Sequence, residues 1–293
     1  MTTYLAVDLG GTKLAAALVA DGVLSARQQL DTQSDKSPEV LRQNLATLLA
    51  SFHDQADQVV VASTGIIQDG RLTALNPQNL GGLDHFPIKA EIEAITGLPT
   101  LVLNDAQAAA WAEYHAAGGQ YANMAFITVS TGVGAGLVID GQLQIGARGI
   151  AGHAGHSLAD PNGPVCGCGR KGCVEAIASG TAIGQQGSEV FGVNCTGQEV
   201  YQRYLAGDEA ATTIVSRSAT AIAQLVADLT ITNDLDAVVI GGGVGLAANY
   251  LELVEEALSS LPAVYQPKLL PAKCSTDAGL IGAALWAQAC SQR

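Results

Sequence analysis

Aromatic and charged residues are scarce in this sequence. Of 293 residues, 4% are aromatic and 14% are charged, with only two tryptophans and two methionines. The chain therefore offers no series of rings on which nucleobases could stack. Basic residues are fewer than acidic ones. The chain has 14 Lys and Arg and 27 Asp and Glu, which gives a formal net charge of −13. This acidic field disfavours nucleic acid and membrane surfaces as partners, although backbone N–H groups can still bind a phosphate locally.

Long apolar runs are also absent. No uncharged apolar stretch reaches the about 18 residues that a transmembrane helix needs. The N-terminus shows no basic region followed by an apolar run and a cleavage site. A composition of 48% hydrophobic residues with 34 glycines is instead typical of a compact globular protein. Three of the six cysteines, Cys195, Cys274 and Cys290, are scattered and expected to be small buried residues. We therefore predict a cytoplasmic protein.

The other three cysteines form the most specific pattern in the chain. Cys166, Cys168 and Cys173 are separated mainly by glycines, and His156 precedes them. Three thiols and one imidazole are a standard ligand set for a closed, tetrahedral structural zinc site. Glycines let a short loop bend tightly enough to aim the sulfurs at one point. The alternative is a disulfide with a spare thiol, which would require an oxidising compartment.

Hydrophobic spacing predicts an α/β protein. The expected strands cover 4–8, 13–20, 21–30, 59–62, 100–103, 125–129, 136–139, 237–240 and 268–270. The expected helices cover 38–56, 88–96, 106–117, 180–190, 197–205, 209–230, 246–260 and 278–289. A strand, a glycine turn and a second strand occur near residue 4 and again near residue 125. This weak duplication indicates two related α/β lobes.

The lobes can be placed on the chain. We expect a smaller N-terminal lobe at 1–118 and a larger lobe, which contains the zinc loop, at 119–276. The C-terminal helix at about 277–293 is a candidate to pack back on the first lobe.

Three glycine-rich turns are candidate phosphate sites, because glycine leaves backbone N–H groups accessible. The candidate phosphate-binding residues are Asp8, Gly10, Gly11, Thr12 and Lys13 in the first turn, Thr131, Gly132, Val133 and Gly134 in the second, and Gly241, Gly242 and Gly243 in the third. Asp8 could also hold Mg²⁺ through water. Neither a Walker loop nor a Rossmann fingerprint is present. Taken singly, each turn is about as well explained as an ordinary tight turn.

Polar residues after two first-lobe strands suggest chemistry. Asp105 follows Asn104 at the end of strand 100–103, where ligand chemistry usually lies in an open α/β sheet. Its carboxylate could accept a proton from an attacking hydroxyl, although a plain helix N-cap is the alternative. Loops with Ser63, Thr64 and Gly65, and with Asn79, carry groups suited to a neutral sugar. They are also ordinary turn formers.

In this order, these segments resemble the ROK family of sugar kinases along the whole chain. The likeness rests on 8–13, 104–105, 130–136 and 241–243, and on the Cys-x-Cys-Gly-x-x-Gly-Cys-x-Glu block at 166–175, which is highly specific to the family. The resemblance implies a two-lobed actin-like ATPase (ribonuclease H-like) fold with a structural zinc loop. Homodimers are common among relatives, and we expect one here.

The resemblance also implies an activity. It implies transfer of the γ-phosphoryl group of ATP to O6 of a sugar, with Mg²⁺ accompanying ATP and Zn²⁺ in a structural role. Asp105 would be the general base, whereas Asn104, His156 and Glu175 would bind sugar hydroxyls. Runs at 63–66, 79–82, 104–114 and 163–180 are most similar to members that act on N-acetylmannosamine.

One position departs from the family pattern. Many members carry a glutamate three residues before the zinc histidine, as a sugar ligand, and this chain has His153 there. A carboxylate only accepts hydrogen bonds, whereas neutral histidine donates one and accepts one. The departure argues against transferring glucose specificity from glutamate-bearing relatives. The simpler interpretation is that His153 only packs beside the loop.

Three other functions remain open. One is a kinase of the same family acting on N-acetylglucosamine or glucose. Another is a sugar-responsive transcriptional repressor, which the start of the first strand near residue 4 disfavours because a DNA-binding segment would precede it. The last is a non-catalytic zinc protein, which would leave three phosphate turns without a purpose.

Overall fold

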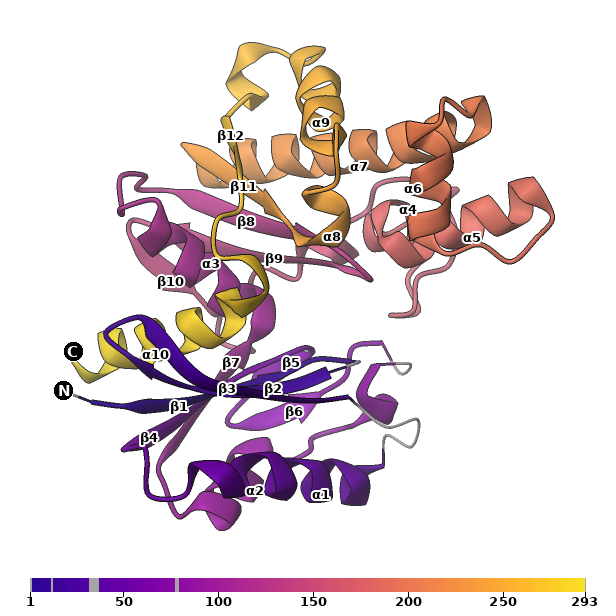
Figure 1. Cartoon of the computed structure of the whole chain (residues 1–293). Coiled ribbons are helices and arrows are strands. Elements are labelled where there is room, and N and C mark those ends of the chain that lie inside the picture. Colours follow the sequence, from indigo (N-terminus) through magenta and orange to yellow (C-terminus); the bar gives the residue numbers. More distant parts are fainter. Residues whose placement is uncertain (1, 12, 32–36, 77–78, 293) are drawn as a thin grey trace. The chain divides into compact units, whose positions relative to one another are not determined.

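The computed structural model describes residues 2–11, 13–31, 37–76 and 79–292 (Figure 1). It divides into two compact units. The first comprises Met1–Gly118, Leu143–Ala151 and Thr276–Arg293, and the second comprises Gly119–Gln142 and Gly152–Ser275. The segment Leu143–Ala151, which we placed in the second lobe, thus groups with the first unit. Each unit is built around a five-stranded sheet.

The sheet of the first unit has the order β3-β2-β1-β4-β7. Its strands are β1 (Tyr4–Leu9), β2 (Lys13–Ala20), β3 (Val23–Asp31), β4 (Gln58–Ser63) and β7 (Thr100–Asn104). The first three form an antiparallel meander, whereas β1, β4 and β7 run parallel. A small separate hairpin pairs β5 (Ile66–Gln68) with β6 (Arg71–Thr73). The parallel strands therefore end along one edge.

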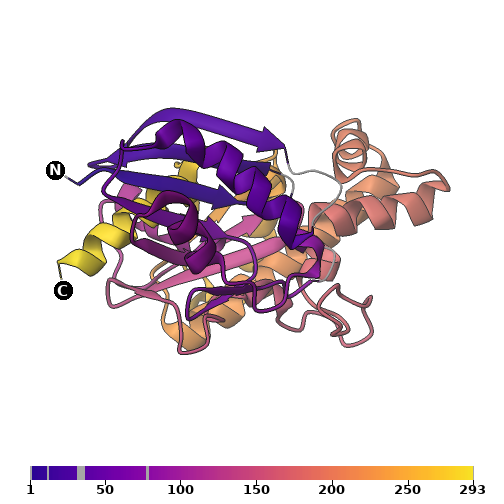
Figure 2. The ribbon, with the colours of Figure 1, turned by 90° about the horizontal axis from the view of Figure 1, so that it is seen from below.

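Side-chain alternation along β1 gives this sheet two different faces. Leu5, Val7 and Leu9 pack in a core of large side chains with α1 (Pro38–Leu49) and α2 (Ile88–Thr96). Tyr4 and Ala6 pack on the opposite face with α3 (Asp105–Ala116) and α10 (Ala278–Ser291). Figures 1 and 2 show α1 and α2 on one side of the sheet and α10 on the other. Asp8 follows the alternation of Tyr4 and Ala6 and so belongs to the α10 face.

The second unit repeats this topology with the order β10-β9-β8-β11-β12. Its strands are β8 (Met124–Val129), β9 (Val133–Ile139), β10 (Gln142–Gln144), β11 (Ala237–Gly241) and β12 (Lys268–Pro271). β8 and β9 form an antiparallel hairpin, and β8, β11 and β12 run parallel. The helices are α4 (Glu175–Ala178), α5 (Gly180–Phe191), α6 (Gly197–Leu205), α7 (Glu209–Asn233), α8 (Gly242–Gly245) and α9 (Tyr250–Ser259). Both sheets thus have a glycine-tipped hairpin followed by parallel strands, as the sequence duplication predicts.

Helix α7 is the central helix of the second unit. By length and composition alone it could cross a membrane. Its buried residues instead include Ile222, Leu225 and Val226, which pack in one core cluster with Ile127 and Ile240 of the sheet. The apolar composition of α7 is therefore explained by core packing.

Several element boundaries differ from those expected. Strand β9 begins at Val133 rather than at residue 136, because pairing with β8 holds the glycine-rich stretch extended despite its low strand propensity. Helix α9 begins at Tyr250 rather than at 246, since Asn249 adopts a left-handed conformation with φ of 66°. The strands β5, β6 and β10 were not predicted, and each is only three residues long. Such short elements leave no periodic signal.

The contact between α10 and α3 leads to a test of the first unit. A Cβ at Gly282 would collide with the carbonyl of Ala108 and lie 3.2 Å from the backbone nitrogen of Ala112. We expect Gly282→Val to lower the free energy of unfolding by about 2–3 kcal/mol, because the helices must separate to admit the side chain. Urea titration measures the loss. Gln288→Ala, at a half-exposed position of the same helix, should change stability by no more than about 0.5 kcal/mol.

Candidate active site and metal centre

Strand register brings the polar residues of the first unit into one row. Leu9 pairs with Ser63, and Ser63 pairs with Asn104, so the ends of β1, β4 and β7 coincide. The N–H of Thr64 donates to the carbonyl of Leu9 at 3.2 Å. Asp8 and Asp105 therefore lie beside neighbouring strand ends, where sites in α/β sheets form.

Asn104 holds this row together. Its Oδ1 accepts from the N–H groups of Ala106 and Gln107, at 2.9 and 3.2 Å, and this caps α3. Its Nδ2 donates to the carbonyls of Gly65, at 3.0 Å, and Ser63, at 3.4 Å. Both lone pairs and both N–H groups of the amide are thus engaged within the protein. In this conformation Asn104 supports the Ser63–Gly65 loop.

Asp105 is the first residue of α3 and is half-buried. Burial of the carboxyl raises its pKa, and hydrogen bonds, chiefly from the N–H of Ala106 at 2.8 Å, partly oppose the rise. Burial also raises the pKa of Asp8 to about 7, and the nearby charge of Asp105 adds to the effect. Two neighbouring carboxyls with raised pKa values are typical of sites that accept protons or bind cations.

Sequence reasoning missed two charged neighbours of Asp8. The Arg27 side chain on β3 donates to Asp277, just before α10, at 2.9 Å. The positive charge of Arg27 lowers the pKa of Asp8, and Asp277 raises it. Asp277 was detectable in the sequence as an acidic residue before the last helix, but no local pattern relates it to residue 8.

The two glycine hairpins are formed as predicted. In the first, the N–H of Gly10 donates to the carbonyl of Lys13 at 3.0 Å. Gly11 is half-buried, and Thr12 lies outside the described residues. In the second, which includes Thr131 and Gly134, the N–H of Ser130 donates to the carbonyl of Gly132 at 2.9 Å.

The third glycine turn ends β11. Gly241 is buried in the strand, whereas Gly242 and Gly243 begin the single turn of α8. A Cβ on Gly243 would meet only the hydroxyl of Ser130, at 4.0 Å, so this glycine borders open space. A turn this short aligns few peptide dipoles, and any phosphate contact would therefore use individual N–H groups.

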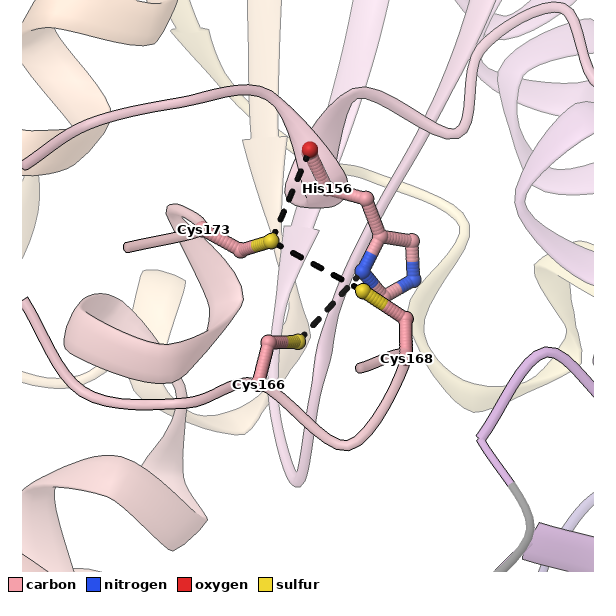
Figure 3. A group of neighbouring side chains, drawn as sticks. All are labelled: His156, Cys166, Cys168 and Cys173. Carbon is pink, nitrogen blue, oxygen red and sulfur yellow. Dashed lines mark hydrogen bonds between the residues drawn. The ribbon is translucent and has the colours of Figure 1, made fainter. Parts of the chain in front are cut away.

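The four zinc-ligand candidates converge in the second unit. Figure 3 shows His156, Cys166, Cys168 and Cys173 pointing toward one another, and their ligand atoms all lie within 4.8 Å of one another. All six cysteines are free thiols in the structure. The disulfide alternative is therefore not what the fold forms.

The distances in this cluster fit a tetrahedral zinc ion. The sulfurs of Cys168 and Cys173 are 3.8 Å apart, and Nδ1 of His156 lies 3.6 Å from the sulfur of Cys166. A Zn–S bond of about 2.3 Å gives a tetrahedral edge of about 3.8 Å, with a slightly shorter edge to nitrogen. Nδ1 faces the sulfurs, so Nε2 of His156 is left to serve another partner. The four residues fit a structural zinc ion.

Glu175 lies between this cluster and the second hairpin. Its Oε2 accepts from the N–H of Val133 at 3.1 Å, and its Oε1 lies 3.8 Å from the sulfur of Cys166. The N–H of Val133, a candidate phosphate donor, is therefore used by Glu175. His153 precedes the short turn Ala154–His156 and is half-buried.

The remaining sugar candidates lie in the first unit. Ser63 is fully buried and donates to the carbonyl of Thr64 at 3.0 Å. Asn79 begins the short 3-10 segment Asn79–Gly82. The preceding residues 77–78 lie outside the described part of the chain.

Comparisons with known proteins show the family of this chain. Residues 4–290 match the ROK family, and the chain belongs to that family. It is 54% identical to the N-acetylmannosamine kinase of Escherichia fergusonii over 288 residues, which cover 98% of each chain. Among solved structures, it resembles the ROK hexokinase of Thermus thermophilus (TM-score 0.84, 32% identity, 99% of each chain). It also resembles a ROK family glucokinase from Streptomyces griseus (TM-score 0.82, 29% identity, 98% of this chain and 99% of that one), solved with glucose and AMPPNP. The fold is the actin-like ATPase fold of ROK sugar kinases.

The thiol cluster leads to a prediction about metal binding. Burial raises the pKa of Cys166 to about 12 and also raises that of Cys173, so zinc must displace their protons. We expect one zinc per chain, with an affinity that rises with pH and falls in acid. Competition with a chromogenic chelator at several pH values measures this. Cys168→Ser should lose the metal, whereas Cys195→Ser, outside the cluster, should keep it; a native protein without zinc would contradict the assignment.

Proposed function

We propose that this protein is an ATP-dependent kinase that phosphorylates N-acetyl-D-mannosamine at O6. The observation that carries the reaction is the raised pKa of Asp105 at the carboxyl edge of the first sheet. The sugar follows from the 54% identity, over nearly the full chain, to a relative that bears this activity in its name. A kinase acting on N-acetylglucosamine or glucose is the alternative.

Asp105 is proposed as the general base. The O6 oxygen of the sugar attacks the γ-phosphorus of ATP, the bond from that phosphorus to the β–γ bridging oxygen breaks, and ADP leaves. The O6 proton passes to the Asp105 carboxylate, and the products are the sugar 6-phosphate and ADP. Phosphoryl transfer needs alignment and charge neutralisation more than covalent chemistry. A raised pKa makes the carboxylate of Asp105 a stronger proton acceptor.

The nucleotide would be held mainly by backbone groups. In the first unit these are the N–H groups of Gly11 and Thr12, with Lys13 adding charge. Gly10 closes this turn through the bond from its N–H to the carbonyl of Lys13. In the second, Thr131, Gly132 and Gly134 would contribute, together with Gly241–Gly243, of which Gly243 borders open space. Asp8 would hold Mg²⁺ through water. The cation, when bound, neutralises charge on the phosphates. The half-buried place of Asp8 on β1 and the nearby charge of Asp105 support this role.

Sugar recognition is proposed for residues of both units. Ser63, Thr64, Gly65 and Asn79 supply polar groups from the first unit, with Asn104 holding their loop. In the second unit His153, His156 and Glu175 supply the polar groups, and zinc would fix the segment that carries them. The availability of Nε2 of His156 supports its double use as ligand and sugar contact.

Assembly and location follow the relatives. We expect a cytoplasmic homodimer with the sugar and ATP as its small-molecule partners. The net charge of −13 supports the absence of nucleic acid and membrane partners.

Replacing Asp105 tests the general base. Asp105→Asn keeps the shape and the bond to Ala106 but cannot accept the O6 proton, so kcat should fall about 10²–10⁴-fold while the sugar still binds. Wild-type kcat should decline as pH falls through the raised pKa, because the carboxyl becomes protonated. In the variant, only the part of the decline that comes from Asp8, whose pKa is raised to about 7, should remain. A variant with wild-type turnover, measured by coupled ADP release, would exclude Asp105 as the base.

A sugar panel tests the substrate. N-acetylmannosamine carries an axial acetamido group at C2, whereas it is equatorial in N-acetylglucosamine, and a site with fixed polar partners discriminates strongly against a mismatch. We expect the highest kcat/KM for N-acetylmannosamine and lower values for N-acetylglucosamine, mannose and glucose. His153→Glu should narrow the gap to glucose, since it restores the carboxylate of glucose-using relatives. A wild-type preference for glucose or N-acetylglucosamine would overturn the substrate but not the kinase reaction.

A further inference from the structure

The tip of the β8–β9 hairpin is bonded to the segment that carries Glu175. The N–H of Gly180 donates to the carbonyl of Ser130 at 2.7 Å. The hydroxyl of Thr181 donates to the carbonyl of Thr131 at 2.8 Å. The N–H of Thr181 also donates to the carbonyl of Thr131, at 3.4 Å. With the bond from the N–H of Val133 to Glu175, four hydrogen bonds join this segment to the hairpin. The start of α5 is thereby fixed to the residues proposed to bind the polyphosphate.

The segment that carries His156 packs on the same hairpin from β9. A Cβ at Gly155 would collide with the carbonyl of Val133, and one at Gly152 would lie 2.6 Å from the carbonyl of Ala135. The turn that leads into His156 therefore lies directly against the β9 backbone. Val133 contacts both the segment of His156 and the carboxylate of Glu175.

Gly132 leaves the space that Glu175 occupies. A Cβ at this glycine would lie 2.6 Å from Oε2 of Glu175, well inside van der Waals contact. Any side chain at residue 132 must displace the carboxylate or the hairpin tip. By contrast, a Cβ at Gly243 would meet nothing closer than 4.0 Å.

We infer that the β8–β9 hairpin positions Glu175 and His156 for the sugar, so that Gly132 and Val133 set sugar affinity as well as nucleotide affinity. This inference rests on the proposed function, because it assigns the hairpin to the nucleotide and Glu175 and His156 to the sugar. A polyphosphate on the hairpin tip restricts the backbone that carries the Glu175 bond. Nucleotide therefore tightens sugar binding, and by thermodynamic linkage sugar tightens nucleotide binding by the same factor.

The test is calorimetric titration of sugar into zinc-loaded protein, with and without AMPPNP and Mg²⁺. The sugar is the one with the highest kcat/KM in the panel, so the outcome does not depend on which hexose the enzyme prefers. In the wild type, nucleotide should lower the sugar Kd about five-fold or more. Gly132→Ala should raise the sugar Kd about ten-fold in nucleotide-free protein and shrink this coupling, because Glu175 is displaced. Its zinc content should stay at one per chain.

Two comparisons distinguish a changed position of Glu175 from general damage to the protein. Gly243→Ala alters a nucleotide-turn glycine but should leave the nucleotide-free sugar Kd within about two-fold of wild type, since its Cβ enters open space. Thr181→Ala removes one bond to the hairpin and should raise the sugar Kd about three-fold. The matched variant Thr213→Ala, whose hydroxyl bonds only the α7 carbonyl of Glu209, should not. Thr181→Ala thus tests the inference even where Gly132→Ala fails to fold.

The outcomes for the inference and for the function are distinct. Unchanged sugar Kd values in Gly132→Ala and Thr181→Ala, with zinc retained and wild-type kinase activity present, would overturn the inference and leave the function standing. A wild type that transfers no phosphate to any sugar of the panel would overturn both. Equal weakening by Gly243→Ala would also contradict the inference, since it would point to disturbance of the whole nucleotide site.

Discussion

Four side chains that fit a zinc ion converge in the least regular part of the second unit. From Gly152 to Val174 the chain forms one short 3-10 turn, with isolated bridges such as that between Leu158 and Cys173. A loop of this composition buries few large apolar side chains, so packing alone cannot specify its conformation. A zinc ion held by His156 and the three cysteines would supply that specification directly. It would also hold His156 and Glu175 in place.

In the first unit the corresponding constraint is the sheet itself. Register places the ends of β1, β4 and β7 together, and alternation directs Asp8 to the face that α10 covers. The neighbouring residues on this face are mainly small, with Ala283 and Ala284 of α10 close to the strands. Small side chains let the helices approach closely, and the carboxyls of Asp8 and Asp105 become desolvated as a result. Their raised pKa values follow from this packing.

The hairpin of the second unit combines two roles that separate motifs suggested. Its glycines leave backbone groups accessible, as a phosphate site requires. The same absence of side chains lets Glu175 reach the N–H of Val133 and lets Gly155 lie against the strand. One structural feature would thus serve both the nucleotide and the residues that we assign to the sugar. Sequence patterns present these as unrelated segments more than forty positions apart, Val133 and Glu175 among them.

The sequence by itself determined the local and chemical features. The Cys166–Cys173 spacing predicted a cluster of metal-ligand side chains, hydrophobic periodicity predicted the long elements, and Asn104-Asp105 marked a strand end followed by a helix. Only the tertiary structure decided which groups meet. Three contacts join residues that are distant in the chain or lie in different elements. They are the hydrogen bond from the Asn104 amide to Gly65, the Arg27–Asp277 ion pair beside Asp8, and the bond from Val133 to Glu175. Such contacts arise from strand register and helix packing, which depend on many residues together and leave no mark on any short stretch of sequence.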